Sequence, residues 1–343
     1  MTSTPAPTPA PTAAPTAAPT AASAALAPPG TIAPYLKEIG RGKDGARSLS
    51  RAQAADLMAR LLDGQLSDLE RGGFALAMRI KGETPEELAG FMDAVVPRTL
   101  PLHAPAPAVV LPSYNGARKL PNLTPLLAML LAREGVPVLV HGPLRDPARV
   151  TSAEVFTALG LPPVASAEAA HARWAAGQPV CMAVDVLHPS LAALLALRAV
   201  LGVRNSGHTL AKLLPGVPGA VRVVNHTHPE YATSLADFLA TTGATALLLR
   251  GTEGEPVADA RRLPALRCFV DGQAAPALSV DAQGGSLASL PELPRGIGAA
   301  DTAQTVRDML AGTLPVPAPI ARQVRCLMDL RAAAASASAP PRA

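Results

Sequence analysis

The chain has 343 residues, of which 49% are hydrophobic and only 3% aromatic, and its formal net charge is +4. This length is enough for two domains or one large one. The mild positive charge is compatible with a polyanionic partner but does not identify one. The three cysteines are far apart and odd in number, which excludes a disulfide framework and favours a reducing, cytoplasmic compartment. No apolar run approaches the ~18 residues of a membrane helix, so we expect no membrane association.

Both ends of the sequence differ in composition from the rest. Residues 1–30 carry no charge and consist mostly of Ala, Pro and Thr. Such a segment cannot build a core, so it is expected to be a disordered tail, and it lacks the basic start of a signal peptide. A second tail, rich in Ala, Ser and Pro, is expected at 332–343.

Residues 31–100 are predicted to form a small helical domain. Capping motifs at 50–53, 67–70 and 84–87 each place Ser or Thr three residues before Gln or Glu. This spacing is typical of a helix start, because the two side chains satisfy each other's free backbone N–H groups. Three short helices make a thin bundle, so we expect them to pack on another part of the chain.

From 105 to 331 the pattern changes to an α/β domain. Short apolar runs alternate with helical stretches, which argues for a mainly parallel sheet. The expected strands are 109–111, 137–140, 180–184, 221–224, 246–249 and 266–270. The expected helices are 125–134, 152–159, 188–200, 229–240, 301–311 and 318–331.

The segment 112–119 is the most informative of the loops. It joins the first strand to a helix start, contains Gly116, and ends in two adjacent cations, Arg118 and Lys119. Free N–H groups at a helix start bind anions, so the loop predicts a phosphate site, although a solvated surface turn is an equal alternative. Ligands in such folds lie beyond the carboxyl ends of the strands. Further cations in the neighbouring loops and in the polar segment around 204–212 are Arg145, Arg149, Arg204, Lys212 and Arg250.

Six separated motifs, at 112–119, 122–127, 140–142, 202–212, 227–231 and 250–255, follow one another in a familiar order, preceded by 37–43. In these motifs the sequence resembles the YbiB-type DNA-binding proteins, which are relatives of anthranilate phosphoribosyltransferase, over roughly residues 34–330. The resemblance implies a class II phosphoribosyltransferase fold with a small N-terminal helical domain and a larger α/β domain. It also implies that helices from about 188–215 join the helical domain, and that the protein is a homodimer formed through it.

Departures from the active transferases bear on function. Those enzymes carry Gly-Thr-Gly-Gly-Asp where this chain has Ser113-Tyr114-Asn115-Gly116, and only one glycine remains to let backbone approach a pyrophosphate. Their Lys-His-Gly-Asn-Arg is here Val140-His141-Gly142-Pro143-Leu144, and their Asp-Glu pair is Glu253-Gly254-Glu255. These changes argue against efficient use of phosphoribosyl pyrophosphate, so no catalytic residue, cofactor or metal is assigned.

The expected function is sequence-nonspecific binding of nucleic acid, with single-stranded DNA favoured and RNA possible, because phosphate neutralisation alone supports such binding. A stacking role for Tyr114 is one hypothesis, and a structural role is the commoner one. The candidate nucleic-acid- or phosphate-binding residues are Lys37, Arg41, Lys43, Arg47, Ser113, Tyr114, Asn115, Gly116, Arg118, Lys119, Asn122, His141, Arg204 and Lys212.

Other functions stay open. An active glycosyl- or phosphoribosyltransferase is the main alternative, and a small-anion-binding protein is a third. His141 and His208 are suited to general base chemistry but equally to hydrogen bonding of loops. A metal site at 225–228 lacks any further ligand pattern.

Overall fold

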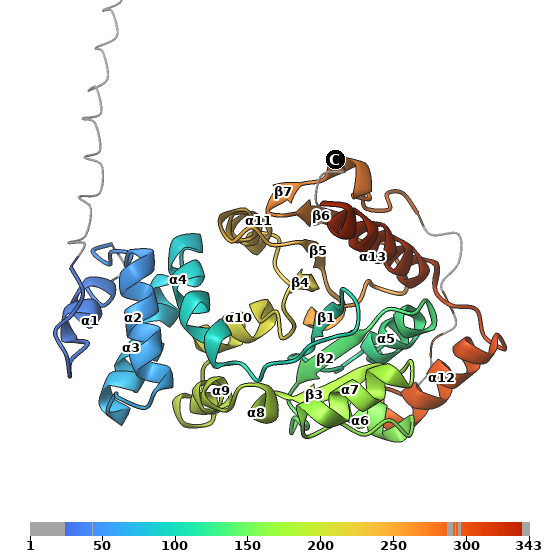
Figure 1. Cartoon of the computed structure of the whole chain (residues 1–343), viewed down its shortest axis with the longest axis horizontal. Coiled ribbons are helices and arrows are strands. Elements are labelled where there is room, and N and C mark those ends of the chain that lie inside the picture. The colour runs from blue at the N-terminus through green and yellow to red at the C-terminus, as the bar shows by residue number, and fades with distance from the viewer. Residues whose placement is uncertain (1–24, 43, 287–290, 292, 294–295, 338–343) are drawn as a thin grey trace, which may run out of the picture.

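The computed structural model of the protein describes residues 25–42, 44–286, 291, 293 and 296–337. A group of helices lies at one side of an α/β domain (Figure 1). This arrangement confirms the predicted fold class, a small N-terminal helical domain followed by a larger domain with a mainly parallel sheet.

The helical domain begins with four helices: α1 (Ala33–Ile39), α2 (Arg51–Leu62), α3 (Asp68–Lys81) and α4 (Pro85–Val95). All three predicted capping boxes are present, at the starts of α2, α3 and α4. Phe74 of α3 and Phe91 of α4 pack edge to face with ring centroids 5.8 Å apart. Aromatic pairs in this geometry add stability beyond the area they bury.

Two later helices lie against these four. They are α9 (Pro189–Leu201), which contacts α2, and α10 (Ser206–Leu213), which contacts α3 and α4. The same α10 also contacts the sheet through β1 and β4. The helical domain and the sheet therefore meet at α10.

The sheet has seven strands in the order β3-β2-β1-β4-β5-β6-β7. The pairs from β3 to β5 are parallel, and β6 and β7 add an antiparallel edge. Every strand segment predicted from an apolar run is present. The strands are β1 (Val109–Pro112), β2 (Val138–Gly142), β3 (Val180–Ala183), β4 (Val221–His226), β5 (Ala246–Arg250), β6 (Leu266–Val270) and β7 (Gln273–Ala274).

Both faces of the sheet are covered, as the near-continuous apolar strands predict. Alternate residues of β1 divide between two cores: Val110 faces the core shared with the helical domain, whereas Val109 and Leu111 face the other. The remaining elements are α5 (Thr124–Arg133), α6 (Ser152–Ala158), α7 (Ala167–Ala175), α8 (Val184–Leu187), α11 (Tyr231–Thr241), α12 (Ala299–Ala311), α13 (Ala318–Ala337), and the short 3₁₀ turns η1 (Val96–Arg98), η2 (Thr252–Gly254) and η3 (Pro276–Leu278).

The predicted C-terminal tail is wrong in its first half, because helix α13 continues through 332–337. The reason is the run of alanines there, which have the highest helix propensity of all residues. Residues 338–343 and most of the predicted N-terminal tail, 1–24, lie outside the described residues. Within the described part, no helix is both long and apolar enough to cross a membrane.

Candidate functional site

The backbone N–H groups of the loop after β1 are bonded to a buried carboxylate of the chain itself. Asn115 and Gly116 each donate from the backbone to Oε1 of Glu255 at 2.7 Å. Its second oxygen, Oε2, accepts from the hydroxyl of Thr124 at 3.2 Å and from the hydroxyl of Ser113. Glu255 is only 2% exposed. Hydrogen bonds from four donors thus hold a carboxylate where the sequence predicts an external phosphate.

A second carboxylate occupies the rest of the same loop. The carboxylate of Glu253 accepts the backbone N–H groups of Arg118 at 2.8 Å, Lys119 at 3.0 Å and Leu120 at 3.2 Å. Burial raises the pKa of Glu253, but these three donors and the charge of Arg149 outweigh it and lower the pKa overall. Glu253 has a φ of 52°, a backbone conformation that non-glycine residues rarely adopt.

Tyr114 and His141 form a buried pair behind the loop. The Tyr114 hydroxyl lies 2.8 Å from Nδ1 of His141, and both side chains are buried. Burial lowers the pKa of His141 to about 4 and raises that of Tyr114 well above its ordinary value. A ring that is 8% exposed has no free face for a base, so the stacking hypothesis for Tyr114 is corrected to a structural role.

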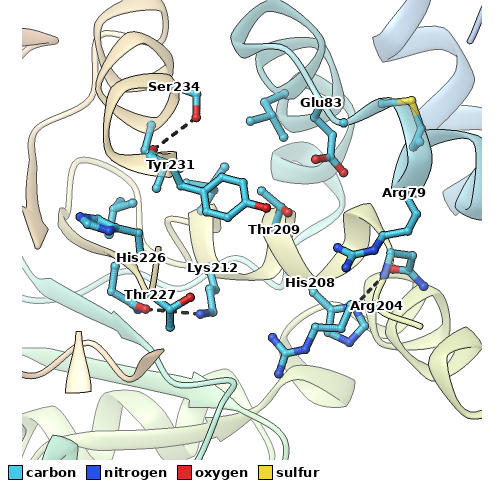
Figure 2. A pocket seen from close by; sticks show the side chains of 18 residues that line it. Arg79, Glu83, Arg204, His208, Thr209, Lys212, His226, Thr227, Tyr231 and Ser234 are labelled. Atoms are coloured by element: carbon cyan, nitrogen blue, oxygen red, sulfur yellow. Dashed lines mark hydrogen bonds between the residues drawn. The ribbon is translucent and has the colours of Figure 1, made fainter. Parts of the chain in front are cut away.

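A cavity of about 290 Å³ lies where the helical domain meets the sheet. Its walls come from the turn between α3 and α4, from α10, from the end of β4, and from the start of α11. Figure 2 shows Arg79, Arg204 and His208 gathered at one end, Lys212 deeper between α10 and β4, and Tyr231 on the far wall. One acid, Glu83, lines the cavity, and burial raises its pKa.

Lys212 is a half-buried cation whose hydrogen-bond partners are neutral. Its Nζ donates to the carbonyl oxygen of Gly254 at 3.1 Å and to Oδ1 of Asn225 at 3.3 Å. No ion pair involves Lys212 among the residues that the structure describes. Burial lowers its pKa to about 8, helped by two arginines and opposed by Glu255. Such a site favours an anionic ligand, which would stabilise the protonated amine.

Two arginines, Arg79 and Arg204, line the cavity, and Arg149 and Arg198 lie close enough to act on Arg204 through their charges. The pKa of Arg204 is lowered by burial and then by Arg198, Arg149 and Arg79, while Asp146 opposes them. The pKa of His208 falls to about 4, first through burial and next through Arg204. His208 is therefore neutral at pH 7, and the lining side chains Arg79, Arg204 and Lys212 carry the positive charge of this cationic cleft, with Arg149 and Arg198 near enough to add to it.

The predicted cations separate into two distant groups. Arg204 and Lys212 line the cavity, and Arg118 and Lys119 are exposed on the loop after β1. Lys37, Arg41 and Arg47 instead lie on or just after α1, at the outer end of the helical domain (Figure 1). Arg41 and Arg47 both pair with Glu38, at 2.7 and 3.9 Å. Lys43 lies outside the described residues.

The polar candidates of the loop are buried rather than free. Ser113, Asn115, Gly116 and His141 lie beneath the surface, and the first three are bonded to Glu255. Asn122 is also buried, and its Oδ1 accepts the backbone N–H of Thr124 at 3.2 Å. Their expected direct contact with a phosphate is therefore replaced by contacts within the chain.

Sequence reasoning missed Arg79 and Arg198. Arg79 lies in the last turn of α3 and Arg198 in α9, on helices that carry no site motif. Arg79 reaches the cavity because α3 packs on α10, and Arg198 comes near Arg204 because α9 also contacts α10. The described residues contain no group of three His, Cys, Asp or Glu side chains arranged to hold a metal.

Comparisons with known proteins agree with this architecture. Residues 33–98 match the helical bundle domain of a glycosyl transferase family. The chain is 42% identical over 310 residues to the uncharacterized protein YbiB of Escherichia coli K12, covering 88% of this chain and 95% of that one. It is 30% identical over 270 residues to the anthranilate phosphoribosyltransferase of Thermus thermophilus, covering 77% and 79%.

The chain belongs to the glycosyl transferase family of the anthranilate phosphoribosyltransferases. A crystal structure of the Thermus thermophilus member superimposes with a TM-score of 0.65 at 24% identity, over 88% of this chain and 89% of that one. The Saccharomyces cerevisiae member, solved with PRPP and Mg, gives 0.65 at 15% identity, over 89% and 90%. At these identities the superpositions show the family fold only. The ligand of this chain therefore has to be inferred from its own residues.

Proposed function

We propose that this protein binds single-stranded nucleic acid, DNA in preference to RNA, without sequence preference and as a homodimer. The binding surface is the cationic cleft between the helical domain and the sheet, extended by Arg118 and Lys119 on the loop after β1. The bound strand is held by its phosphates.

The proposal depends on one observation. Cationic side chains line a cleft, and the N–H groups of the neighbouring loop after β1 are already bonded to carboxylates of the chain. Glu253 and Glu255 accept the N–H groups of the loop, so these donors do not face an incoming pyrophosphate. The cations beside the loop remain, and Lys212 makes no ion pair within the described chain, although the charge of Glu255 lies near it. A polyanion with evenly spaced charges satisfies several such cations at once.

The same geometry favours a single strand read through its backbone. The cavity mouth is lined by guanidinium groups and hydroxyls, and the aromatic side chain on its wall is Tyr231, which is 51% exposed. An exposed ring beside cations suits stacking of any base, because every base has a π face. A duplex hides its bases, so it could not use this ring for stacking.

Helix α3 supplies a face for a second copy of the chain. Leu69, Leu76 and Ile80 repeat at helical spacing and are 86%, 43% and 70% exposed. Leucine and isoleucine gathered on one exposed helix face indicate a contact surface. Pairing two copies through α3 would bring two cationic clefts into one assembly and raise affinity by avidity.

A salt series tests the proposal. We expect a fluorescently labelled single-stranded oligonucleotide of mixed sequence to bind more tightly than its duplex. The logarithm of its affinity should fall steeply and linearly with the logarithm of salt concentration, since binding releases counterions. Equal affinity at low and high salt, or a strong preference for one base sequence, would contradict it.

A transferase is the second candidate, favoured by the family of the chain and by the relatives named anthranilate phosphoribosyltransferase. Its test is release of pyrophosphate from phosphoribosyl pyrophosphate and anthranilate with magnesium present. Turnover would support this candidate, and no turnover together with salt-sensitive oligonucleotide binding would leave the first one standing.

A further inference from the structure

We propose that Cys268 and Cys326 form a site of reversible oxidation, in which a hydroperoxide converts the two thiols to a disulfide that ties the C-terminal helix to the sheet. This site lies away from the cationic cleft and does not depend on nucleic-acid binding.

The two sulfurs are already in contact. Cys268 lies on strand β6 and Cys326 on helix α13, 58 positions apart in sequence, and their Sγ atoms are 3.3 Å from each other. Both side chains are buried, at 1% and 2% exposure. Bond formation requires the sulfurs to close to about 2.05 Å, a short movement for side chains on packed elements.

The surroundings of the pair favour thiol chemistry over metal binding. Both sulfurs lie beside one backbone oxygen, that of Leu278, at 3.4 Å from Cys268 and 3.5 Å from Cys326. No third metal-ligating side chain joins them among the described residues. Two thiols and one carbonyl do not complete the tetrahedral sulfur and nitrogen set that zinc requires.

Access to the pair is through the turn η3. Leu278 ends this turn and contacts both sulfurs, while Pro276 and Ala277 of the same turn are exposed. Displacing one short turn would therefore uncover the thiols. Because both thiols are buried, we expect a small uncharged peroxide to reach them rather than a bulky disulfide.

The reaction starts at Cys326 and is balanced by one peroxide. One sulfur accepts a hydrogen bond from the other, which stabilises a thiolate on the accepting sulfur; in the proposed reaction Cys326 is that sulfur, and its pKa is lowered. The thiolate attacks one peroxide oxygen and becomes a sulfenic acid as the O–O bond breaks, and the released hydroxide takes up the proton to form water. The sulfur of Cys268 then attacks the sulfenic sulfur, and its proton leaves with the hydroxyl as a second water. Two thiols lose two electrons, and the peroxide gains them.

Cys181 provides a matched control inside the same chain. It is also buried, but it lies on β3, at the opposite edge of the sheet, and makes no contact with another sulfur among the described residues. Burial raises its pKa to about 12, which suppresses the reactive thiolate. We expect Cys181 to stay reduced under conditions that link the other two.

The experiment is a non-reducing peptide map of the full-length chain after treatment with hydrogen peroxide and alkylation. The expected product is one linked peptide pair, joining Cys268 to Cys326 with the loss of two hydrogens, reversed by dithiothreitol, with Cys181 alkylated. The midpoint of thermal unfolding should rise on oxidation in the wild type and in Cys181→Ser, and stay constant in Cys268→Ser.

Two results would overturn the proposal. One is alkylation of both Cys268 and Cys326 at a peroxide dose that already oxidises Cys181. The other is their separate oxidation to sulfinic acids without a linked peptide. If Cys268→Ser does not fold, the peptide maps of the wild type and Cys181→Ser decide the matter alone.

Discussion

Arg204 donates from Nη1 to the side-chain oxygen of Asn115 at 3.0 Å, which joins the cationic cleft to the loop after β1. Asn115 in turn donates its backbone N–H to Glu255 and its side-chain amide to the carbonyl of Glu253, at 2.9 Å. The loop that carries the chain's own carboxylates and the arginine that faces the cavity are thus parts of one network.

Replacing Arg204 tests this network as a binding surface. We expect Arg204→Ala to weaken oligonucleotide binding about 10-fold and to reduce the salt slope, since one phosphate contact is lost. Titration by fluorescence anisotropy at several salt concentrations measures both. Arg133→Ala is the matched control, because Arg133 is exposed on α5 and donates to the carbonyl of Leu310 on another side of the molecule. Equal losses in the two variants would contradict a localised cleft.

Lys212 predicts a pH dependence of binding. Its pKa in the free protein is about 8, below its ordinary value of 10.5, so the amine loses its charge as pH rises through 8. A bound phosphate stabilises the protonated form, so affinity should be constant below about pH 7 and fall above it. Lys212→Arg should flatten the profile, because a guanidinium stays charged in this range. A wild-type affinity that does not change up to pH 9 would count against phosphate contact at Lys212.

The lowered pKa of Lys212 also makes the free energy of unfolding depend on pH. The folded pKa is lower than that of the unfolded chain, so the unfolded chain binds more protons between about pH 8 and 10.5. The contribution of this residue to the free energy of unfolding therefore increases as pH rises through that window. Urea denaturation of the wild type and Lys212→Met at several pH values would reveal the difference.

Glu255 should be essential for stability. Glu255→Ala removes the acceptor of two backbone N–H groups and two hydroxyls in a buried place, at a cost of roughly 3–5 kcal/mol. Chemical denaturation measures this loss. Glu86→Ala, which removes an exposed acid in the first turn of α4, should leave the midpoint nearly unchanged. A small effect at Glu255 would mean that the loop donors find other acceptors.

Charge on the apolar face of α3 should separate the proposed dimer. We expect Leu76→Glu to shift the protein to a monomer in analytical ultracentrifugation, because a carboxylate in an apolar contact is not solvated. Leu144→Glu is the control, since Leu144 is 46% exposed in the α/β domain. A wild type that is already monomeric at micromolar concentration would remove the dimer from the proposal.

The sequence predicts the fold well where the signal is local. Apolar runs mark the strands, and the pairs Ser50–Gln53 and Ser67–Glu70 mark helix starts, because the spacing of a capping box is fixed by one helical turn. Helix α13 extends beyond its predicted end at residue 331. The prediction ended too early because the final alanine-rich segment has the composition of a tail. In that segment helix propensity prevails over the low-complexity pattern.

The site is less predictable because its contacts are distant in sequence. Glu255 and Asn115 are 140 positions apart, and no local sequence pattern indicates that this carboxylate accepts the N–H groups of the loop. Arg79 likewise reaches the cavity, and Arg198 comes near Arg204, only through helix packing. The sequence does identify Arg204 and Lys212, because the polar and basic segment around 204–212 stands out between apolar helices.

The conformation of Glu253 has a consequence for every small anion that approaches the loop. Its carboxylate is tethered to the chain and already bonded to three N–H groups, so it competes at a high effective concentration. A free phosphate must displace this internal ligand before it can bind. The N–H groups of the loop are therefore already occupied by the chain's own carboxylate, and dissolved phosphate at ordinary cellular levels is a weak competitor for them.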